Sequence, residues 1–328
     1  MTDAPALIEV RHLVKRFPLG RGALFSKADK AVHAVSDVSF HIAKGETLSL
    51  VGESGCGKST VGKCLAQLIP LTAGEITLDG QRIDGLSRAQ MKPVRKRMNV
   101  VFQDPFSSLN PRMSVEQLVA EPLRSHGLAR TRAERQARVG DLLEKVGLPR
   151  EAMVRMPHQF SGGQRQRICI ARALASEPDI IICDEAVSAL DVSVQAQIIN
   201  LLMDLQKDLG LALLFISHDL AVVEHMSDRI AVMYLGRIME IADREAMFRH
   251  PRHPYTKALL SAVPLPDPEA SRDRVVLKGD VPSPIDPPSG CFFRTRCPMA
   301  TDRCAAEAPK LRDMGPGHQS ACHYADEV

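Results

Sequence analysis

The sequence Gly52-Glu53-Ser54-Gly55-Cys56-Gly57-Lys58-Ser59-Thr60 matches the pattern G-x-x-x-x-G-K-[ST] at every specified position. An apolar run over residues 47–51 precedes it, and a helical pattern over residues 61–69 follows it. A strand, a glycine-rich turn and a helix N-terminus together direct backbone N–H groups at phosphate oxygens. The stretch therefore predicts a nucleoside triphosphate loop, in which Lys58 reaches the β- and γ-phosphates and the Ser59 hydroxyl binds Mg²⁺. The alternative, a glycine-rich turn that merely precedes a lysine, does not explain why strand, Lys and Ser all agree.

The composition is that of an ordinary globular protein. The 328 residues are 45% hydrophobic and 25% charged, which allows one large domain and a smaller one. No apolar run reaches the roughly 18 residues of a membrane-spanning helix, and the first residues form no signal sequence. The formal net charge of +3 is too small to argue for nucleic acid as a partner. We therefore expect a cytoplasmic protein, and any role at a membrane must come through partners.

Strand and helix patterns alternate along the first two thirds of the chain, which predicts an α/β domain with a mostly parallel sheet. A helical stretch, about residues 104–160, interrupts the alternation. Frequent prolines after Pro251 place a domain boundary near residue 260, with residues 261–328 as a small loop-rich appendage. We expect buried strands at 180–184 and 211–216, a hairpin at 229–241, and helices at 161–175, 218–226 and along the stripe Val194, Ile198, Leu201, Leu205 and Leu209.

Two carboxylates end one of the predicted buried strands. Asp184 can hold Mg²⁺ through water, and Glu185, which points elsewhere, can polarise an attacking water. By itself, a pair of carboxylates after a strand is common and usually has no function beyond placing a solvated strand end at the surface. The phosphate-loop pattern upstream makes the functional interpretation the stronger one.

A second anion-binding helix start is predicted at Ser161-Gly162-Gly163-Gln164. A chain with one nucleotide loop does not need a second phosphate cradle about a hundred residues later. The stretch makes sense if it serves a nucleotide held by another chain. A plainly capped helix is the alternative interpretation.

These motifs, in this order, resemble the nucleotide-binding subunits of ABC (ATP-binding cassette) proteins over about residues 6–250. The resemblance implies a P-loop NTPase ABC cassette in residues 1–260, with a RecA-like core, an antiparallel β subdomain and a helical insertion. Residues 52–60 correspond to the Walker A loop, 161–164 to the signature and 180–184 to Walker B. Ala186 and Phe160 replace the Pro and Leu that are common in the family. The nucleotide-binding residues implied are Phe17, Gly52, Ser54, Gly55, Cys56, Gly57, Lys58, Ser59, Thr60, Gln103, Ser161, Gly162, Gly163, Gln164, Asp184 and the D-loop residue Asp191.

The resemblance also implies roles for these residues. Glu185 would be the general base, His218 would contact the γ-phosphate, and Gln103 would sense Mg²⁺ and link the site to a membrane partner. Ser59, Gln103 and Asp184 would hold Mg²⁺, and Phe17 would stack on adenine. Two such cassettes meet head to tail, with each ATP between the Walker A loop of one and the signature of the other. Judged alone, His218 would be a structural histidine and Phe17 a core residue.

Four further stretches are similar to the ATPases of oligopeptide/dipeptide importers: residues 101–112, 191–197, 250–256 and 290–298. This similarity implies a peripheral subunit on the cytoplasmic face of the inner membrane. Its partners would be a second, related ABC ATPase, two membrane permeases and an extracytoplasmic peptide-binding protein. Nickel, glutathione and other small solutes are alternative cargoes. Rival functions are a soluble ABC ATPase that acts on nucleic acid or ribosomes, and a module that binds ATP without hydrolysing it.

Cys291, Cys297, Cys304 and Cys322 form a C-x5-C-x6-C-x17-C pattern near the C-terminus. Thiolates suit zinc or iron–sulfur clusters, but the close C-x2-C pairs of common zinc modules are missing. Members of the importer subfamily carry a 4Fe-4S cluster at matching cysteines, so the resemblance implies a cluster with a structural role. Zinc and free thiols are the alternatives.

Overall fold

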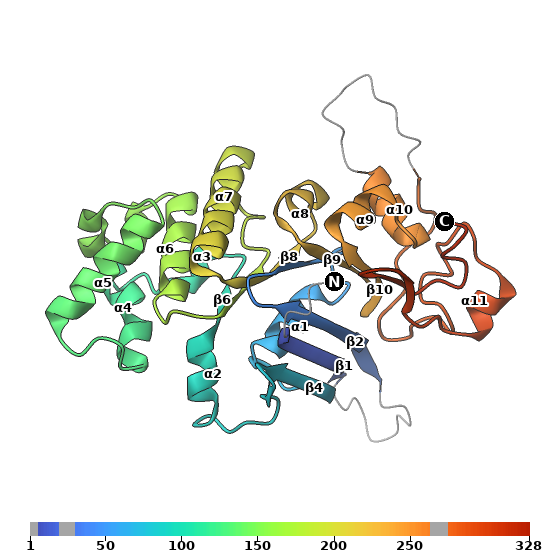
Figure 1. Ribbon diagram of the computed structural model, residues 1–328, viewed down its shortest axis with the longest axis horizontal. Coiled ribbons are helices and arrows are strands. Elements are labelled where there is room, and N and C mark those ends of the chain that lie inside the picture. The colour runs from blue at the N-terminus through green and yellow to red at the C-terminus, as the bar shows by residue number, and fades with distance from the viewer. Residues whose placement is uncertain (1–5, 20–29, 263–274) are drawn as a thin grey trace. The chain divides into compact units, whose positions relative to one another are not determined.

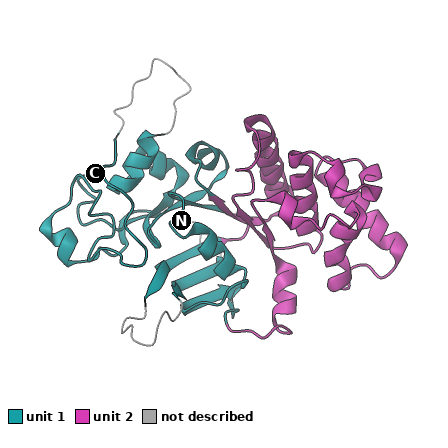
Figure 2. Ribbon diagram, turned by 180° about the vertical axis from the view of Figure 1, so that it is seen from behind, with its two compact units in different colours: residues 1–42, 47–84, 217–328 teal, residues 43–46, 85–216 magenta. Residues whose placement is uncertain are grey.

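The computed structural model describes residues 6–19, 30–262 and 275–328 (Figure 1). The chain divides into two compact units (Figure 2). Unit 1 consists of residues 1–42, 47–84 and 217–328, and unit 2 of residues 43–46 and 85–216. Of the C-terminal segment 261–328, residues 263–274 lie outside the described ranges. No helix in the described part of the chain is long and apolar enough to cross a bilayer.

Unit 1 contains an antiparallel sheet with the strand order β2-β1-β4-β5. Across β1 and β4, Ile8 pairs with Leu78 and Val10 pairs with Ile76, and all four side chains are buried. Such apolar cross-strand pairs give the sheet one face against the core. The expected antiparallel β subdomain is therefore present. The strands are β1 (Ala6–Pro18), β2 (Ala31–Ala43), β4 (Ala73–Leu78) and β5 (Gln81–Arg82).

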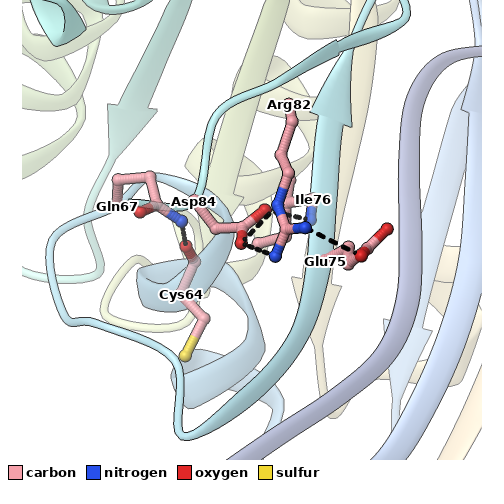
Figure 3. Close-up of polar contacts among 6 residues, drawn as sticks. All are labelled: Cys64, Gln67, Glu75, Ile76, Arg82 and Asp84. Atoms are coloured by element: carbon pink, nitrogen blue, oxygen red, sulfur yellow. Dashed lines mark hydrogen bonds and ion pairs between the residues drawn. The ribbon is translucent and has the colours of Figure 1, made fainter. Parts of the chain in front are cut away.

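A polar network closes the β4–β5 hairpin of this sheet (Figure 3). The Arg82 guanidinium donates to Glu75 at 2.8 Å and to Asp84 at 2.8 and 3.0 Å, and the Ile76 N–H donates to Asp84 at 2.7 Å. Burial raises the pKa of Asp84, but the hydrogen bonds from Arg82 and Ile76 outweigh it and lower the pKa below its ordinary value. The carboxylate is therefore ionised wherever the protein is folded near neutral pH.

A second group of strands in unit 1 follows the order β11-β12-β10-β9-β3. Strand β3 runs parallel to β9, and the other neighbours are antiparallel. The predicted hairpin is confirmed: it turns at Leu235 and Gly236, which have φ of 44° and 80°. The pairing of β12 with β10 was not expected from the sequence. These elements are β3 (Thr47–Val51), β9 (Arg229–Tyr234), β10 (Arg237–Asp243), β11 (Arg312–Gly315) and β12 (His318–Ser320), with helices α1 (Lys58–Leu65), α8 (Leu220–Met226), α9 (Arg244–Arg249), α10 (Pro254–Ser261) and α11 (Asp302–Ala306).

Unit 2 contains three parallel strands, with β7 (Ile180–Asp184) between β6 (Met98–Val101) and β8 (Ala212–Ser217). Every residue of β7 and β8 is buried, as their continuous apolar sequences predict. Helices cover the strands and fill the stretch predicted to be helical. They are α2 (Met91–Arg97), α3 (Pro105–Ser108), α4 (Val115–Ser125), α5 (Arg132–Lys145), α6 (Gly162–Leu174) and α7 (Val192–Leu209), with 3₁₀ turns at Arg150–Val154 and Pro157–Gln159.

Two helices differ in detail from their sequence patterns. In α7 the buried residues are Ile198, Ile199, Leu202 and Leu205, whereas Leu209 is 44% exposed. The buried face is thus rotated from the predicted stripe, because Ile199 and Leu202 also face the core. Helix α8 begins at Leu220 rather than at residue 218, because the Asp219 carboxylate caps it by accepting hydrogen bonds from the Ala221 and Val222 N–H groups.

Candidate functional site

The predicted phosphate loop joins β3 to α1 in unit 1. Its glycines at 52, 55 and 57 have φ of 151°, 78° and 108°. A Cβ on Gly52 would lie 2.1 Å from the Met233 carbonyl oxygen, and one on Gly57 would lie 2.2 Å from that of Ala34. Both positions therefore require glycine for space as well as for backbone conformation. Strand β3 is buried throughout, so the loop begins from a rigid base.

The lysine of this loop turns into the loop itself. Lys58 is 3% exposed, and its ammonium donates to the carbonyl oxygens of Gly52 at 2.8 Å and Glu53 at 3.0 Å. Cys56 is buried beside it, and burial raises the pKa of the Cys56 thiol despite the nearby ammonium. The thiol is therefore a neutral packing group. Ser59 and Thr60, which follow at the start of α1, are half-buried, whereas Ser54 and Gly55 are exposed.

Residues from the C-terminal third of the chain also hold the loop. The Tyr255 hydroxyl accepts a hydrogen bond from the Glu53 N–H at 3.0 Å. Arg296 donates to both oxygens of the Glu53 carboxylate, at 2.6 and 3.1 Å. No sequence motif marks either residue as a contributor to this site. They lie within the stretches 250–256 and 290–298 that carry the importer resemblance, and that is the only signal the sequence holds for them.

Two further predicted site residues of unit 1, Phe17 and His218, lie close to the ends of strands. Phe17, near the end of β1, is 38% exposed, so it is not a core residue. The Lys15 ammonium lies 4.8 Å from its ring centroid. His218 is exposed between β8 and α8. Its neighbours Ser217 and Asp219 are linked by a hydrogen bond of 3.0 Å from the Asp219 N–H to the Ser217 hydroxyl. The adenine contact of Phe17 and the phosphate contact of His218 stay predictions.

Unit 2 brings together three other predicted residues. Strands β6 and β7 are parallel, and Val101 pairs with Cys183, so Asp184, which ends β7, and Gln103, which follows β6, lie at the carboxyl ends of neighbouring strands. Ligands of open α/β sheets bind at this edge. Asp184 is 8% exposed, Glu185 is half-buried and Gln103 is exposed. Asp104, next to Gln103, caps α3 through the N–H groups of Phe106 and Ser107, and these hydrogen bonds lower the pKa of Asp104.

Glu185 has an unusual backbone conformation for a glutamate, with φ of 49°. Its N–H donates to the Ile216 carbonyl at 3.0 Å. Its own carbonyl accepts from the Ser188 N–H at 3.1 Å and from the Ser188 hydroxyl at 3.0 Å. A residue other than glycine in this region costs roughly 1–3 kcal/mol, and such strain gathers at functional sites. The catalytic role of Glu185 stays a prediction.

The predicted signature begins α6 in the same unit. The Ser161 hydroxyl accepts from the Gln164 N–H, and the Gln164 side chain accepts from the Ser161 N–H. Ser161 therefore caps α6, as the alternative interpretation of this stretch predicted. A contact between the stretch and a nucleotide stays a prediction. A Cβ on Gly163 would lie 2.3 Å from Val194 Cγ1, so this glycine lets α6 approach the start of α7 closely. Asp191 caps α7, and its hydrogen bonds from Val194 and Ser193 lower its pKa.

The candidate nucleotide residues are thus divided between the units. The phosphate loop, Phe17 and His218 belong to unit 1, and Gln103, the signature, Asp184, Glu185 and Asp191 belong to unit 2.

The four C-terminal cysteines line one small pocket in unit 1, and all four are free. Burial raises the pKa of the Cys297 thiol to about 11 and raises those of Cys291 and Cys322. Among the described residues, no three His, Cys, Asp or Glu side chains are spaced as ligands of a metal ion. The four sulfur atoms face one pocket, but the described residues form no preformed metal site. The structure therefore does not support the predicted 4Fe-4S cluster.

Comparison with known families covers most of the chain. Residues 35–188 match the ABC transporter family, and residues 239–304 match the C-terminal region of oligopeptide/dipeptide transporters. The chain is 51% identical over 320 residues to the oligopeptide transport ATP-binding protein AppF of Bacillus subtilis, covering 97% of each. It is 55% identical over 323 residues to a probable peptide ABC transporter ATP-binding protein, y4tS, of Sinorhizobium fredii, covering 98% of this chain and 90% of y4tS.

Solved structures with the same fold are ABC cassettes. A dimeric, post-hydrolysis structure of the cassette MJ0796 with ADP and Pi is 28% identical, with a TM-score of 0.64, and covers 72% of this chain and 98% of that one. CbiO1 from Clostridium perfringens, part of an ABC transporter complex, is 28% identical, with a TM-score of 0.63, and covers 74% and 90%. Fold and motifs therefore define a P-loop ATPase of the cassette type. The chain belongs to the ABC transporter family, in its oligopeptide/dipeptide transporter group.

Proposed function

We propose that this ATPase powers the import of dipeptides or oligopeptides through a membrane ABC transporter. The observation that carries the proposal is the match to peptide transport ATP-binding proteins over 97–98% of the chain, including the C-terminal region. A soluble ABC ATPase acting on ribosomes or nucleic acid has no comparable support. Nickel, glutathione or another small solute is the alternative cargo, because a cassette does not contact what is transported.

The similarity to peptide transport ATP-binding proteins also suggests which proteins this chain binds. We infer two membrane permeases, a second ABC ATPase subunit related to this one, and an extracytoplasmic peptide-binding protein. The chain would then sit as a peripheral subunit on the cytoplasmic face of the inner membrane. In such an assembly the signature at Ser161–Gln164 serves the ATP held by the phosphate loop of the partner cassette.

Each predicted residue has a specific task in hydrolysis. Lys58 leaves the carbonyls of Gly52 and Glu53 to bind the β- and γ-phosphates, and the loop N–H groups cradle them. The oxygens of Ser59, Gln103 and Asp184 are hard donors suited to Mg²⁺, which neutralises phosphate charge when bound. Phe17 stacks on adenine.

Hydrolysis of the γ-phosphate bond is assigned to residues of unit 2 together with His218 of unit 1. Glu185 takes a proton from water, the water oxygen forms a bond to the γ-phosphorus, and the bond between that phosphorus and the ADP oxygen breaks. His218 contacts the γ-phosphate, and Gln103 senses Mg²⁺ and links the site to the permease. The strained backbone of Glu185 supports this assignment, because its orientation is held by hydrogen bonds to Ile216 and Ser188.

A mild-detergent pull-down of the tagged chain from native membranes tests the transport role. We expect two polytopic permeases and a second cassette to co-purify, and the cognate binding protein to carry peptide. Ribosomal proteins or nucleic acid without any membrane protein would refute it. A binding protein that carries nickel or glutathione would change the cargo and leave the importer assignment intact.

We further propose that Cys291, Cys297, Cys304 and Cys322 hold a 4Fe-4S cluster with a structural role. The support is that four thiols converge on one pocket, and that thiolates are the usual ligands of such clusters. After anaerobic purification we expect about four iron atoms per chain with matching acid-labile sulfide. Cys291→Ser should lose both, while Cys169→Ser, at a buried cysteine of unit 2, should keep them. Zinc, or no metal, in the wild-type protein would refute the cluster.

A further inference from the structure

Glu53, the second residue of the phosphate loop, has partners on all of its polar groups. Its carbonyl accepts from Lys58 Nζ at 3.0 Å, and its N–H donates to the Tyr255 hydroxyl at 3.0 Å. Its carboxylate takes two hydrogen bonds from Arg296. Tyr255 and Arg296 lie 202 and 243 residues further along the chain. Two side chains of the C-terminal third therefore contact the loop at Glu53, and the Gly236 N–H donates to the Cys56 carbonyl at 2.8 Å.

The contact between Arg296 and Glu53 is not an ordinary surface ion pair. The Arg296 side chain is 8% exposed and that of Glu53 is 29% exposed. The guanidinium meets the carboxylate with two parallel N–H···O bonds, a geometry that fixes direction as well as distance. These hydrogen bonds, which Arg296 donates to the Glu53 carboxylate, are the main reason why the pKa of Arg296 is raised, so its charge is permanent. Loss of either partner would leave a charge in a largely dry site.

An aromatic cluster keeps the C-terminal anchors in place. Tyr234, Tyr255 and Phe293 are fully buried, with ring centroids 4.9–5.3 Å apart. The Arg296 guanidinium lies 5.8 Å from the Tyr234 centroid. Tyr234 meets both other rings edge to face, a preferred geometry that adds to the stabilisation from burial. The loop is thus tied to a rigid cluster, although its own glycines at 55 and 57 could take other conformations.

We propose that Arg296 and Tyr255 are positioning residues for ATP, which hold Glu53 so that the phosphate loop is preorganised for the nucleotide. The inference rests on the proposed ATP-binding role of the loop. Its physical basis is that phosphate affinity depends on the directions of successive loop N–H groups, which a released Glu53 would no longer fix. The C-terminal segment is then part of the nucleotide site of unit 1.

The test is ATP affinity of the full-length chain with Mg²⁺, measured by displacement of a fluorescent N-methylanthraniloyl-ATP probe. Arg296→Gln should raise the Kd for ATP about tenfold. The Kd of Arg296→Lys should lie between those of Arg296→Gln and the wild type, since lysine keeps the positive charge but cannot form the two hydrogen bonds of the guanidinium. Tyr255→Phe removes only the hydroxyl and should raise the Kd about threefold. Arg303→Gln is the control, because Arg303 pairs with Glu307 in an exposed contact of the same segment.

A role in positioning also predicts that Arg296→Gln raises the KM for ATP more than it lowers kcat. A lower melting temperature with a Kd within twofold of wild type would overturn the inference and leave a purely structural contact. If Arg296→Gln does not fold, an unchanged Kd in Tyr255→Phe would overturn it equally. Failure of the wild-type chain to bind ATP would instead refute the proposed function itself.

Discussion

At the scale of the residue, Glu185 carries the most information. It directly follows β7, a strand that is buried along its whole length, and its φ of 49° turns its backbone away from the strand path. Hydrogen bonds to Ile216 and from Ser188 hold this conformation. A solvated strand end needs no such strain. Glu177 has a positive φ as well, so the conformation fixes the direction of Glu185 while its catalytic role stays a prediction.

Glu185→Gln should lower ATP hydrolysis by about 100-fold or more, because the amide cannot take the proton from water. ATP binding should remain, and the bound nucleotide should stay unhydrolysed. Steady-state phosphate release and the nucleotide content of the isolated protein measure the two effects.

Glu177→Gln is the matched control for that variant. Glu177 also has a positive φ, of 56°, and belongs to unit 2, but its carboxylate is exposed and lies near Arg138. Hydrolysis should stay at the wild-type rate. Equal activity in Glu185→Gln and wild type would refute the assigned base.

At the scale of the element, glycines set how closely helices and loops approach one another. Gly162 and Gly163 both begin α6, and the sequence gives no reason to separate them. The structure does: a Cβ at 163 would lie 2.3 Å from Val194 Cγ1, whereas one at 162 would lie 3.5 Å from Leu190 Cδ2. The first contact is an overlap and the second is ordinary van der Waals distance.

Gly163→Ala should therefore lower the free energy of unfolding by about 1–3 kcal/mol, because α6 and the start of α7 must move apart. Gly162→Ala should change it little, since alanine favours a helix and fits the space. Urea unfolding followed by circular dichroism compares the two. Equal stability of both variants would show that the packing of α6 on α7 is not as close as described.

At the scale of the whole molecule, the C-terminal segment is built into unit 1. Strand β12 pairs with β10, and Phe293 is fully buried against Tyr234 and Tyr255. Glu240 of β10 is fully buried, and one oxygen accepts from His318 Nε2 at 2.7 Å and from the Arg252 N–H at 2.6 Å. That residues 261–328 form a separate domain stays a prediction.

His318→Ala should lower the free energy of unfolding by about 2–3 kcal/mol, because it takes one donor from a buried carboxylate. His225→Ala, at an exposed histidine of α8 in the same unit, should change it by less than about 0.5 kcal/mol. Chemical denaturation of the full-length variants gives both values. A loss for His318→Ala no larger than that for His225→Ala would contradict a stabilising role for the link between β10 and β12.

Local patterns were enough to predict much of this protein. The loop at 52–60, the buried strands and the hairpin at 229–241 follow from residue spacing, because each depends on neighbours within a few positions. The order of the motifs along the chain was enough to predict the family and the α/β fold. The α7 stripe was only partly right, since which helical residues are buried depends on what packs against them.

By itself, the sequence determined the class of chemistry: glycines, lysine and carboxylates at fixed spacing suit phosphate and Mg²⁺ and little else. Only the tertiary structure decided what supports that chemistry. The Arg296 and Tyr255 contacts to Glu53 and the convergence of four cysteines join residues distant in sequence, and no local pattern encodes such distances. The strain at Glu185 is likewise imposed by bonds from a neighbouring strand and a following turn.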